Sequence, residues 1–351
     1  MKEASTQRPH ESGLKKKGIW LVALKLLTAF IPVIALFFAN FLFSTSFAER
    51  LADNIIAGKK SYTFSNYNDR KLGKKIVERQ RPVPETIVLS SSTGMQISSE
   101  TTGYRRQMNL CMTGGTFIDY IAILQLYEEQ GRGFPKRVVL ALNASNFLEA
   151  VRHGQYGYIF DDAIADFYNM SGLERLKLLS KQLADFVKEN LMFRFLISGQ
   201  YNLYERKEAS FTPERMGGIN PDGHRDYSEM HDRTFLMAKK AAALLDAPRV
   251  DSFPEEPTRR FNDIRRFCEE REIELVLFLL PLAPDPEGEP RNANHGAFAR
   301  DLESYVKKLS EGLIVHGTFL PYELGLTNED FHDDESHMKQ ENLKRVWDYV
   351  R

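Results

Sequence analysis

The feature that most constrains the fold is a short apolar run that breaks abruptly into small hydroxyl-bearing residues. Thr86–Leu89 is apolar and β-branched, which predicts a buried strand of a parallel sheet. Three serines, a threonine and a glycine follow at 90–94. Open α/β sheets bind ligands at the carboxyl ends of their strands, so this turn lies where a site is expected. The turn is either the site of a serine nucleophile or a polar strand-to-helix turn with a capping side chain.

A serine nucleophile needs a histidine as its base and a carboxylate that orients the histidine. The sequence offers such a pair near its C-terminus, where Asp334 precedes His337 by three positions. Asp333 is the neighbouring carboxylate and an alternative orienting group. Because this pair follows the last expected strand, we expect it at the same edge of the sheet as the serine turn. A serine of this turn, His337 and one of the two carboxylates are therefore expected to converge.

Apolar runs alternate with amphipathic stretches along the rest of the chain. Further strands are expected at 107–110, 137–142, 274–280 and 313–318, and helices at 116–129, 257–271, 298–310 and 336–350. This alternation predicts an α/β fold in which a parallel five-stranded sheet is sandwiched between helices.

A segment at about 147–253 separates the third and fourth expected strands and is too long for a simple crossover. We expect it to be an insertion that is helical over 161–196 and loop-like and aromatic afterwards. Its place in the chain predicts that it folds over the strand ends and shapes a substrate cleft.

The N-terminal region contains an almost entirely apolar run, Ile19–Phe43, which is long enough to cross a bilayer as a helix. Lys15–Lys17 precede it and predict a cytoplasmic N-terminus. Ser46–Ala48 resembles a weak cleavage site, so a signal peptide is the alternative. The charged stretch after the run predicts a solvated stalk, although its lysines could also lie along anionic headgroups. The expected organisation is a cytoplasmic tail (1–18), a transmembrane helix (19–43), a stalk (44–84) and an extracytoplasmic domain (85–351).

Composition narrows the function classes. The formal net charge of −1 leaves no excess of Lys and Arg to neutralise phosphates, which argues against a nucleic-acid-binding protein. Cys111 and Cys268 are the two cysteines, too few for a disulfide scaffold or a Cys-rich zinc site, and their surroundings favour buried thiols. The histidines other than His337 have no ligand-like spacing. We therefore expect neither a metal nor a cofactor.

The order and spacing of these motifs resemble the SGNH (GDSL-like) hydrolase superfamily, in its membrane-anchored bacterial branch, over about Glu85–Arg351. The first block of that family is Gly-Asp-Ser or Gly-Ser-Ser after a strand. It corresponds to Leu89–Ser92 here and implies that Ser92 is the nucleophile. The last block, Asp-x-x-His, corresponds to Asp334–His337. The resemblance implies that His337 is the general base and that Asp334 orients it.

Two further blocks of the family supply the donors that stabilise an oxyanion. The second block matches Asn109–Gly114 and implies that Gly114 offers its backbone N–H. The third block, Gly-x-Asn-Asp, falls on Ala144–Phe147 and makes Asn146 the side-chain donor. Its glycine and aspartate are absent here, so Asn143 competes for that role. Ser90 stands where the first block of the family has its glycine.

The resemblance implies a membrane-anchored serine hydrolase or acyltransferase that acts on an O-acylated cell-envelope polymer. It implies a single-pass protein of the bacterial inner membrane, whose partners are the lipid bilayer, an acylated glycan or small acyl ester, and a membrane-bound acyltransferase. Two other functions stay open, because fold alone does not fix function. One is a non-catalytic binding or assembly subunit of an envelope polysaccharide system, and the other is a plain esterase for small or lipid esters.

Overall fold

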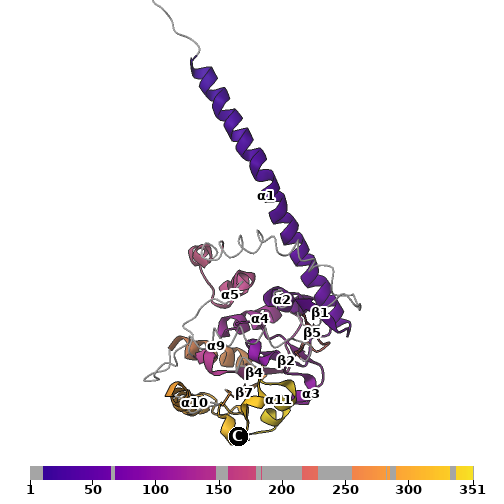
Figure 1. Ribbon diagram of the computed structural model, residues 1–351, viewed down its shortest axis with the longest axis vertical. Coiled ribbons are helices and arrows are strands. Elements are labelled where there is room, and N and C mark those ends of the chain that lie inside the picture. Colours follow the sequence, from indigo (N-terminus) through magenta and orange to yellow (C-terminus); the bar gives the residue numbers. More distant parts are fainter. Residues whose placement is uncertain are drawn as a thin grey trace, which may run out of the picture.

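The computed structural model describes residues 11–64, 68–147, 157–178, 183, 216–227, 255–281, 283–284, 290–332 and 337–350. Its centre is a five-stranded sheet in the order β3–β2–β4–β7–β8, with every neighbouring pair parallel (Figure 1). The strands are β2 (Thr86–Leu89), β3 (Gln107–Asn109), β4 (Arg137–Leu142), β7 (Glu274–Leu279) and β8 (Ile314–Gly317). The predicted five-stranded parallel sheet is confirmed.

Helices cover both faces of this sheet, and alternate strand residues face the two layers. Ile87 and Leu89 share a core with α1 (Glu11–Ile56), α2 (Asp69–Arg79), α4 (Phe117–Gln130), α9 (Glu255–Glu270) and α10 (Pro290–Leu309). Val88 and Val139 are paired in the register of β2 and β4, and they belong to a second core with α11 (Gln340–Trp347). The short helix α3 (Ser99–Thr102) contacts α11. Burial on both faces explains why the strands are continuous apolar runs.

The strand order creates a switch point beside β2. The chain runs from β2 outward to β3 and then returns to β4 on the opposite side of β2. In doubly wound sheets, ligands bind outside the carboxyl ends of the strands where the order reverses in this way. The serine turn follows β2 and the segment with Asn143 follows β4, so both lie at the switch point.

Helix α1 extends away from the sheet and its surrounding helices (Figure 1). It contains the apolar run 19–43 that was expected to span a membrane. Among the residues that the structure describes, no helix is long and apolar enough to cross a membrane. The transmembrane helix stays a prediction.

The segment expected to be a solvated stalk is instead folded onto the domain. Its first part is the end of α1, where Leu51 and Ile55 are buried. It then forms β1 (Ser61–Phe64) and α2, which packs against α1 and α4. Leu72 and Ile76 are one helical turn apart and buried on the same side of α2. Lys71, Lys74 and Lys75 are interleaved with these apolar residues, so the charged composition of the stretch predicts a solvated segment although the helix has a buried side.

The described part of the insertion contains a small second sheet. β5 (Met216–Ile219) pairs antiparallel with both β1 and β6 (Arg225–Asp226), so the prediction of a loop over this stretch is wrong. Earlier in the insertion, the 3-10 turn η3 (Gly157–Phe160) leads into α5 (Asp161–Phe167), which packs on α4. Residues 172–178 are also helical, and most of the remaining insertion lies outside the described residues. The other short turns are η1 (Ser92–Gly94), η2 (Ala144–Phe147), η6 (Pro321–Leu324) and η7 (Asn328–Asp330).

Candidate active site

The serine turn begins as the strand β2 ends. Ser90 is fully buried, and its carbonyl accepts a hydrogen bond from the Met112 backbone N–H at 3.0 Å. A Cβ atom on Gly94 would clash with the Ser90 side chain. Ser90 therefore fits at this position because Gly94, four residues later, leaves the space open. Ser92 starts η1 and is half-buried.

Asn143, the first residue after β4, reaches the serine turn from the neighbouring strand. Its side-chain amide donates to Ser91 Oγ at 2.7 Å and to Thr93 Oγ1 at 2.8 Å. These two hydroxyls, which flank Ser92 in sequence, are 3.0 Å from each other. The side chain of Asn143 is thus held directly against the turn that carries the candidate nucleophile.

Asn146 points elsewhere. Its amide donates to the Tyr120 hydroxyl at 3.4 Å, and its Oδ1 accepts the Asn143 backbone N–H at 2.9 Å. Burial raises the pKa of Tyr120 well above its ordinary value, so this hydroxyl stays neutral. The geometry favours Asn143 over Asn146 as the asparagine that serves the serine turn, a choice that the sequence left open.

Gly114 lies in the turn between β3 and α4. Its φ of +58° is in the left-handed region, which favours glycine, and no atom would contact a Cβ placed there. The same loop adjoins the serine turn, because a Cβ on Gly115 would lie 2.8 Å from the Ser90 carbonyl oxygen. Asp69 and Arg70 of α2 hydrogen-bond to the backbone of this loop.

The segment of His337 is tied, across a long sequence separation, to the residues that follow the serine turn. The Gln96 side-chain amide donates to the Met338 carbonyl at 2.7 Å. Tyr227 lies between the two segments: its hydroxyl contacts Met95 Sδ at 3.2 Å, and its ring centroid lies 6.1 Å from that of His337 in an edge-on arrangement. A hydrogen bond between Ser92 and His337 stays a prediction. Asp334 and its neighbour Asp333 lie outside the described residues.

Tyr227 belongs to the described end of the insertion. Arg225, two residues before it, donates its backbone N–H to the Met95 carbonyl at 2.7 Å. Burial raises the pKa of Tyr227 to about 12, so its phenol is a neutral hydrogen-bonding group. This part of the insertion therefore lies against the segment that follows the serine turn. Its role in shaping a substrate cleft stays a prediction.

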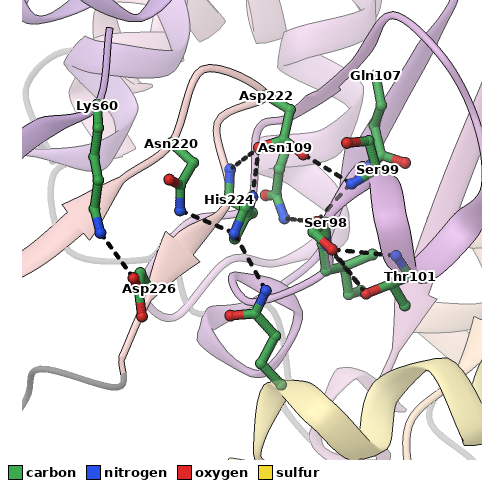
Figure 2. Close-up of polar contacts among 12 residues, drawn as sticks. Lys60, Ser98, Ser99, Thr101, Gln107, Asn109, Asn220, Asp222, His224 and Asp226 are labelled. Atoms are coloured by element: carbon green, nitrogen blue, oxygen red, sulfur yellow. Dashed lines mark hydrogen bonds and ion pairs between the residues drawn. The ribbon is translucent and has the colours of Figure 1, made fainter.

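Sequence reasoning missed an acid–histidine pair in the same region (Figure 2). His224 Nδ1 bonds Asp222 Oδ1, and Asp222 Oδ2 accepts the Ser99 backbone N–H at 2.8 Å. The side-chain amides of Asn220 and Gln340 lie 2.9 and 3.3 Å from His224 Nε2.

The Asp222–His224 pair joins the insertion to α3 and α11. Burial alone would raise the pKa of Asp222, but its hydrogen bond and charge interaction with His224 hold that pKa below the ordinary value. The local signal was the Pro221-Asp222-Gly223 turn, closed by the Gly223 N–H on the Asn220 carbonyl at 2.8 Å. Because Gln340 follows His337 by three residues, the pair also helps to fix the segment of the candidate base.

The two cysteines are free thiols; Cys268 is buried, as expected, whereas Cys111 is only half-buried. Burial raises the pKa of both Cys111 and Cys268, so neither is a reactive thiolate. Within the described ranges, no group of three or more His, Cys, Asp or Glu side chains is arranged to hold a metal ion.

No protein-family model matches the chain, and no curated protein matches it.

Proposed function

We propose that the chain is a serine acyl-ester hydrolase or acyltransferase with Ser92 as nucleophile, His337 as general base and Asp334 as the carboxylate that orients the base. The observation that carries the proposal is the contact of Asn143 with the serine turn at the switch point of the sheet. The serine turn follows β2 and the polar donor Asn143 follows β4. These are the two neighbouring strands between which a sheet of this order is expected to bind a ligand.

The chemistry follows from these assignments. The Ser92 hydroxyl attacks the acyl carbonyl while His337 takes its proton. The oxyanion that forms is stabilised by the backbone N–H of Gly114 and by an asparagine amide. Collapse of the tetrahedral intermediate breaks the ester bond, and the departing alcohol oxygen takes the proton from His337. Water then releases the acyl group in a hydrolase, whereas a sugar hydroxyl accepts it in a transferase.

One observation favours the non-catalytic alternative and sharpens the test. The two hydrogen bonds from the Asn143 amide to Ser91 and Thr93 use both of its N–H donors. An oxyanion must displace one of these hydroxyls before Asn143 can serve it. A binding or assembly subunit of an envelope polysaccharide system would need no such exchange.

The proposed substrate is an O-acylated cell-envelope glycan, with a membrane-bound acyltransferase as the partner that supplies or receives the acyl group. The resemblance of the motif blocks to the envelope-acylation branch of the SGNH superfamily supports this class. A small acyl ester carries the same scissile bond and serves as the model substrate.

The proposed location is the bacterial inner membrane, with the N-terminus in the cytoplasm and residues 85–351 outside. Large apolar side chains of α1 are between 44% and 75% exposed and support this proposal: Trp20, Leu21, Val22, Leu24, Phe30, Ile31, Val33, Ile34, Phe38 and Leu42. A reporter that is active only outside the membrane, fused after Arg351, should be active. Activity of a cytoplasmic reporter at that position instead would overturn the topology.

The activity is tested with the full-length chain in detergent and a chromogenic acetyl ester. Wild type should turn the ester over, Ser92→Ala should not, and Ser91→Ala should keep measurable activity because Ser91 only supports the turn. Equal rates for wild type and Ser92→Ala would contradict the proposal and favour the binding subunit. An acylated acceptor glycan added to the assay distinguishes transfer from hydrolysis.

A further inference from the structure

The first turn of α2 carries two charged side chains that are almost completely buried. Arg70 is 2% exposed and donates from Nε and Nη2 to the two carboxylate oxygens of Asp119, at 2.7 and 2.8 Å. Asp69 is 8% exposed and is paired with Arg225. Burying charges is costly even when they are paired, so such pairs contribute more to a defined geometry than to stability.

The backbone that this cluster holds is the loop of Gly114. Arg70 Nη1 donates to the Thr113 carbonyl at 3.2 Å, and Nη2 donates to the Gly114 carbonyl at 3.3 Å. Asp69 Oδ2 accepts the Thr113 backbone N–H at 2.9 Å. Three backbone polar groups at two successive residues are thus bound by side chains of α2.

The peptide between Thr113 and Gly114 links this clamp to the proposed chemistry. Its C=O and N–H belong to one planar trans unit and point in opposite directions. With the carbonyl held by Arg70, the Gly114 N–H must point away from the guanidinium. The positive charge at the carbonyl also polarises the peptide, which makes its N–H a stronger donor.

We propose that Arg70 is a positioning residue for the oxyanion hole, because it fixes and polarises the peptide whose N–H, on Gly114, is the donor. The inference rests on the proposed function. On its other side the loop is bound to the serine turn through the Met112 N–H and the Ser90 carbonyl, 3.0 Å apart. The Arg70 clamp and the serine turn therefore hold the loop from two sides.

The test compares Arg70→Lys with a matched variant on the same helix. Lysine keeps the positive charge opposite Asp119. It lacks the planar guanidinium, which donates hydrogen bonds to the Asp119 carboxylate and to the carbonyls of Thr113 and Gly114 at the same time. The kcat for the acetyl ester should fall about 10- to 100-fold with KM nearly unchanged, because the donor is misplaced in the transition state. Arg79→Lys is the control, because the Arg79 guanidinium donates to both carboxylate oxygens of Asp53 at the surface. This variant should keep wild-type kcat.

Hydrogen exchange at the amides of Met112–Gly115 tests the clamp without any substrate. Exchange should be at least about 10-fold faster in Arg70→Lys than in wild type, while the amides of β4 are unchanged. If Arg70→Lys does not fold, the neutral pair Arg70→Gln with Asp119→Asn leaves no stranded charge and should show the same loop exchange. Unchanged exchange at the loop, or wild-type kcat in an active enzyme, overturns the inference. Absence of turnover in wild type overturns the proposed function and the catalytic role of the clamp, whereas faster loop exchange would still support the clamp itself.

Discussion

Replacement of Asn143 gives the most informative perturbation of the candidate site. Asn143→Ala removes the two hydrogen bonds to Ser91 and Thr93. Each neutral hydrogen bond contributes about 0.5–1.5 kcal/mol to stability, so the loss of both can cost at most about 3 kcal/mol in the free energy of unfolding. The two hydroxyls still bond each other at 3.0 Å, and we therefore expect a loss of about 1–2 kcal/mol in the free energy of unfolding.

The catalytic effect should be larger than this stability effect. Loss of one oxyanion donor costs about 2.7–4 kcal/mol of transition-state stabilisation, so kcat of Asn143→Ala should fall about 100- to 1000-fold. In Asn143→Asp both hydroxyls can donate to the new carboxylate, which keeps the turn in place, but its negative charge opposes the oxyanion. That variant should remain closer to wild type in stability and still lose activity.

Two assays separate these effects: urea unfolding for the free energy and ester turnover for kcat. Asn146→Ala is the matched control, because Asn146 donates to Tyr120 and not to the serine turn. Wild-type kcat in Asn143→Ala, or a larger loss of kcat in Asn146→Ala than in Asn143→Ala, would contradict the assignment of Asn143 as the oxyanion donor. The second result would return the oxyanion role to Asn146.

Two further predictions concern stability. Burial, and then the charge of Asp162, raise the pKa of Asp161 from 3.8 to about 7. The folded state therefore binds a proton more tightly than the unfolded chain, and stability should fall as pH rises from about 4 to about 7. Asp161→Asn should be about 2–4 kcal/mol more stable than wild type at pH 8 and equal to it near pH 4 in urea unfolding; a difference independent of pH would contradict this. Gly94→Ala should lose about 1–3 kcal/mol through the clash with Ser90, and adding Ser90→Gly should restore most of it. The melting temperatures of the single and double variants check this prediction. A double variant that melts no higher than Gly94→Ala would show that the Ser90 side chain is not what destabilises Gly94→Ala.

The sheet could be predicted because its strands carry their own local signal. Thr86–Leu89 and Arg137–Leu142 are apolar runs of strand length, and burial on both faces requires that composition. The strand order could not be predicted in the same way, since pairing is set by contacts between distant segments. The strand Met216–Ile219 was missed because its Gly217-Gly218 is unfavourable in strands, and pairing with β1 outweighs that preference.

The candidate site was predictable to a similar extent. The serine turn and the glycine of the second block follow strand ends, and both could be located from their neighbours in sequence. The choice between Asn143 and Asn146 depends on how η2 turns after β4, which has no sequence signature. The pair of Asp222 and His224 was missed because its further partners, Ser99 and Gln340, are 123 and 116 residues away.

The identity of the nucleophile is tested most directly by reaction of the folded, full-length protein with a fluorophosphonate, followed by peptide mapping in a mass spectrometer. An activated serine displaces fluoride and keeps the phosphonyl group, so this measurement needs no knowledge of the natural substrate. We predict one adduct, on Ser92, which is absent in Ser92→Ala and strongly reduced in His337→Ala. No adduct on the folded wild-type protein, or an adduct on Ser91 that persists in Ser92→Ala, would contradict this prediction.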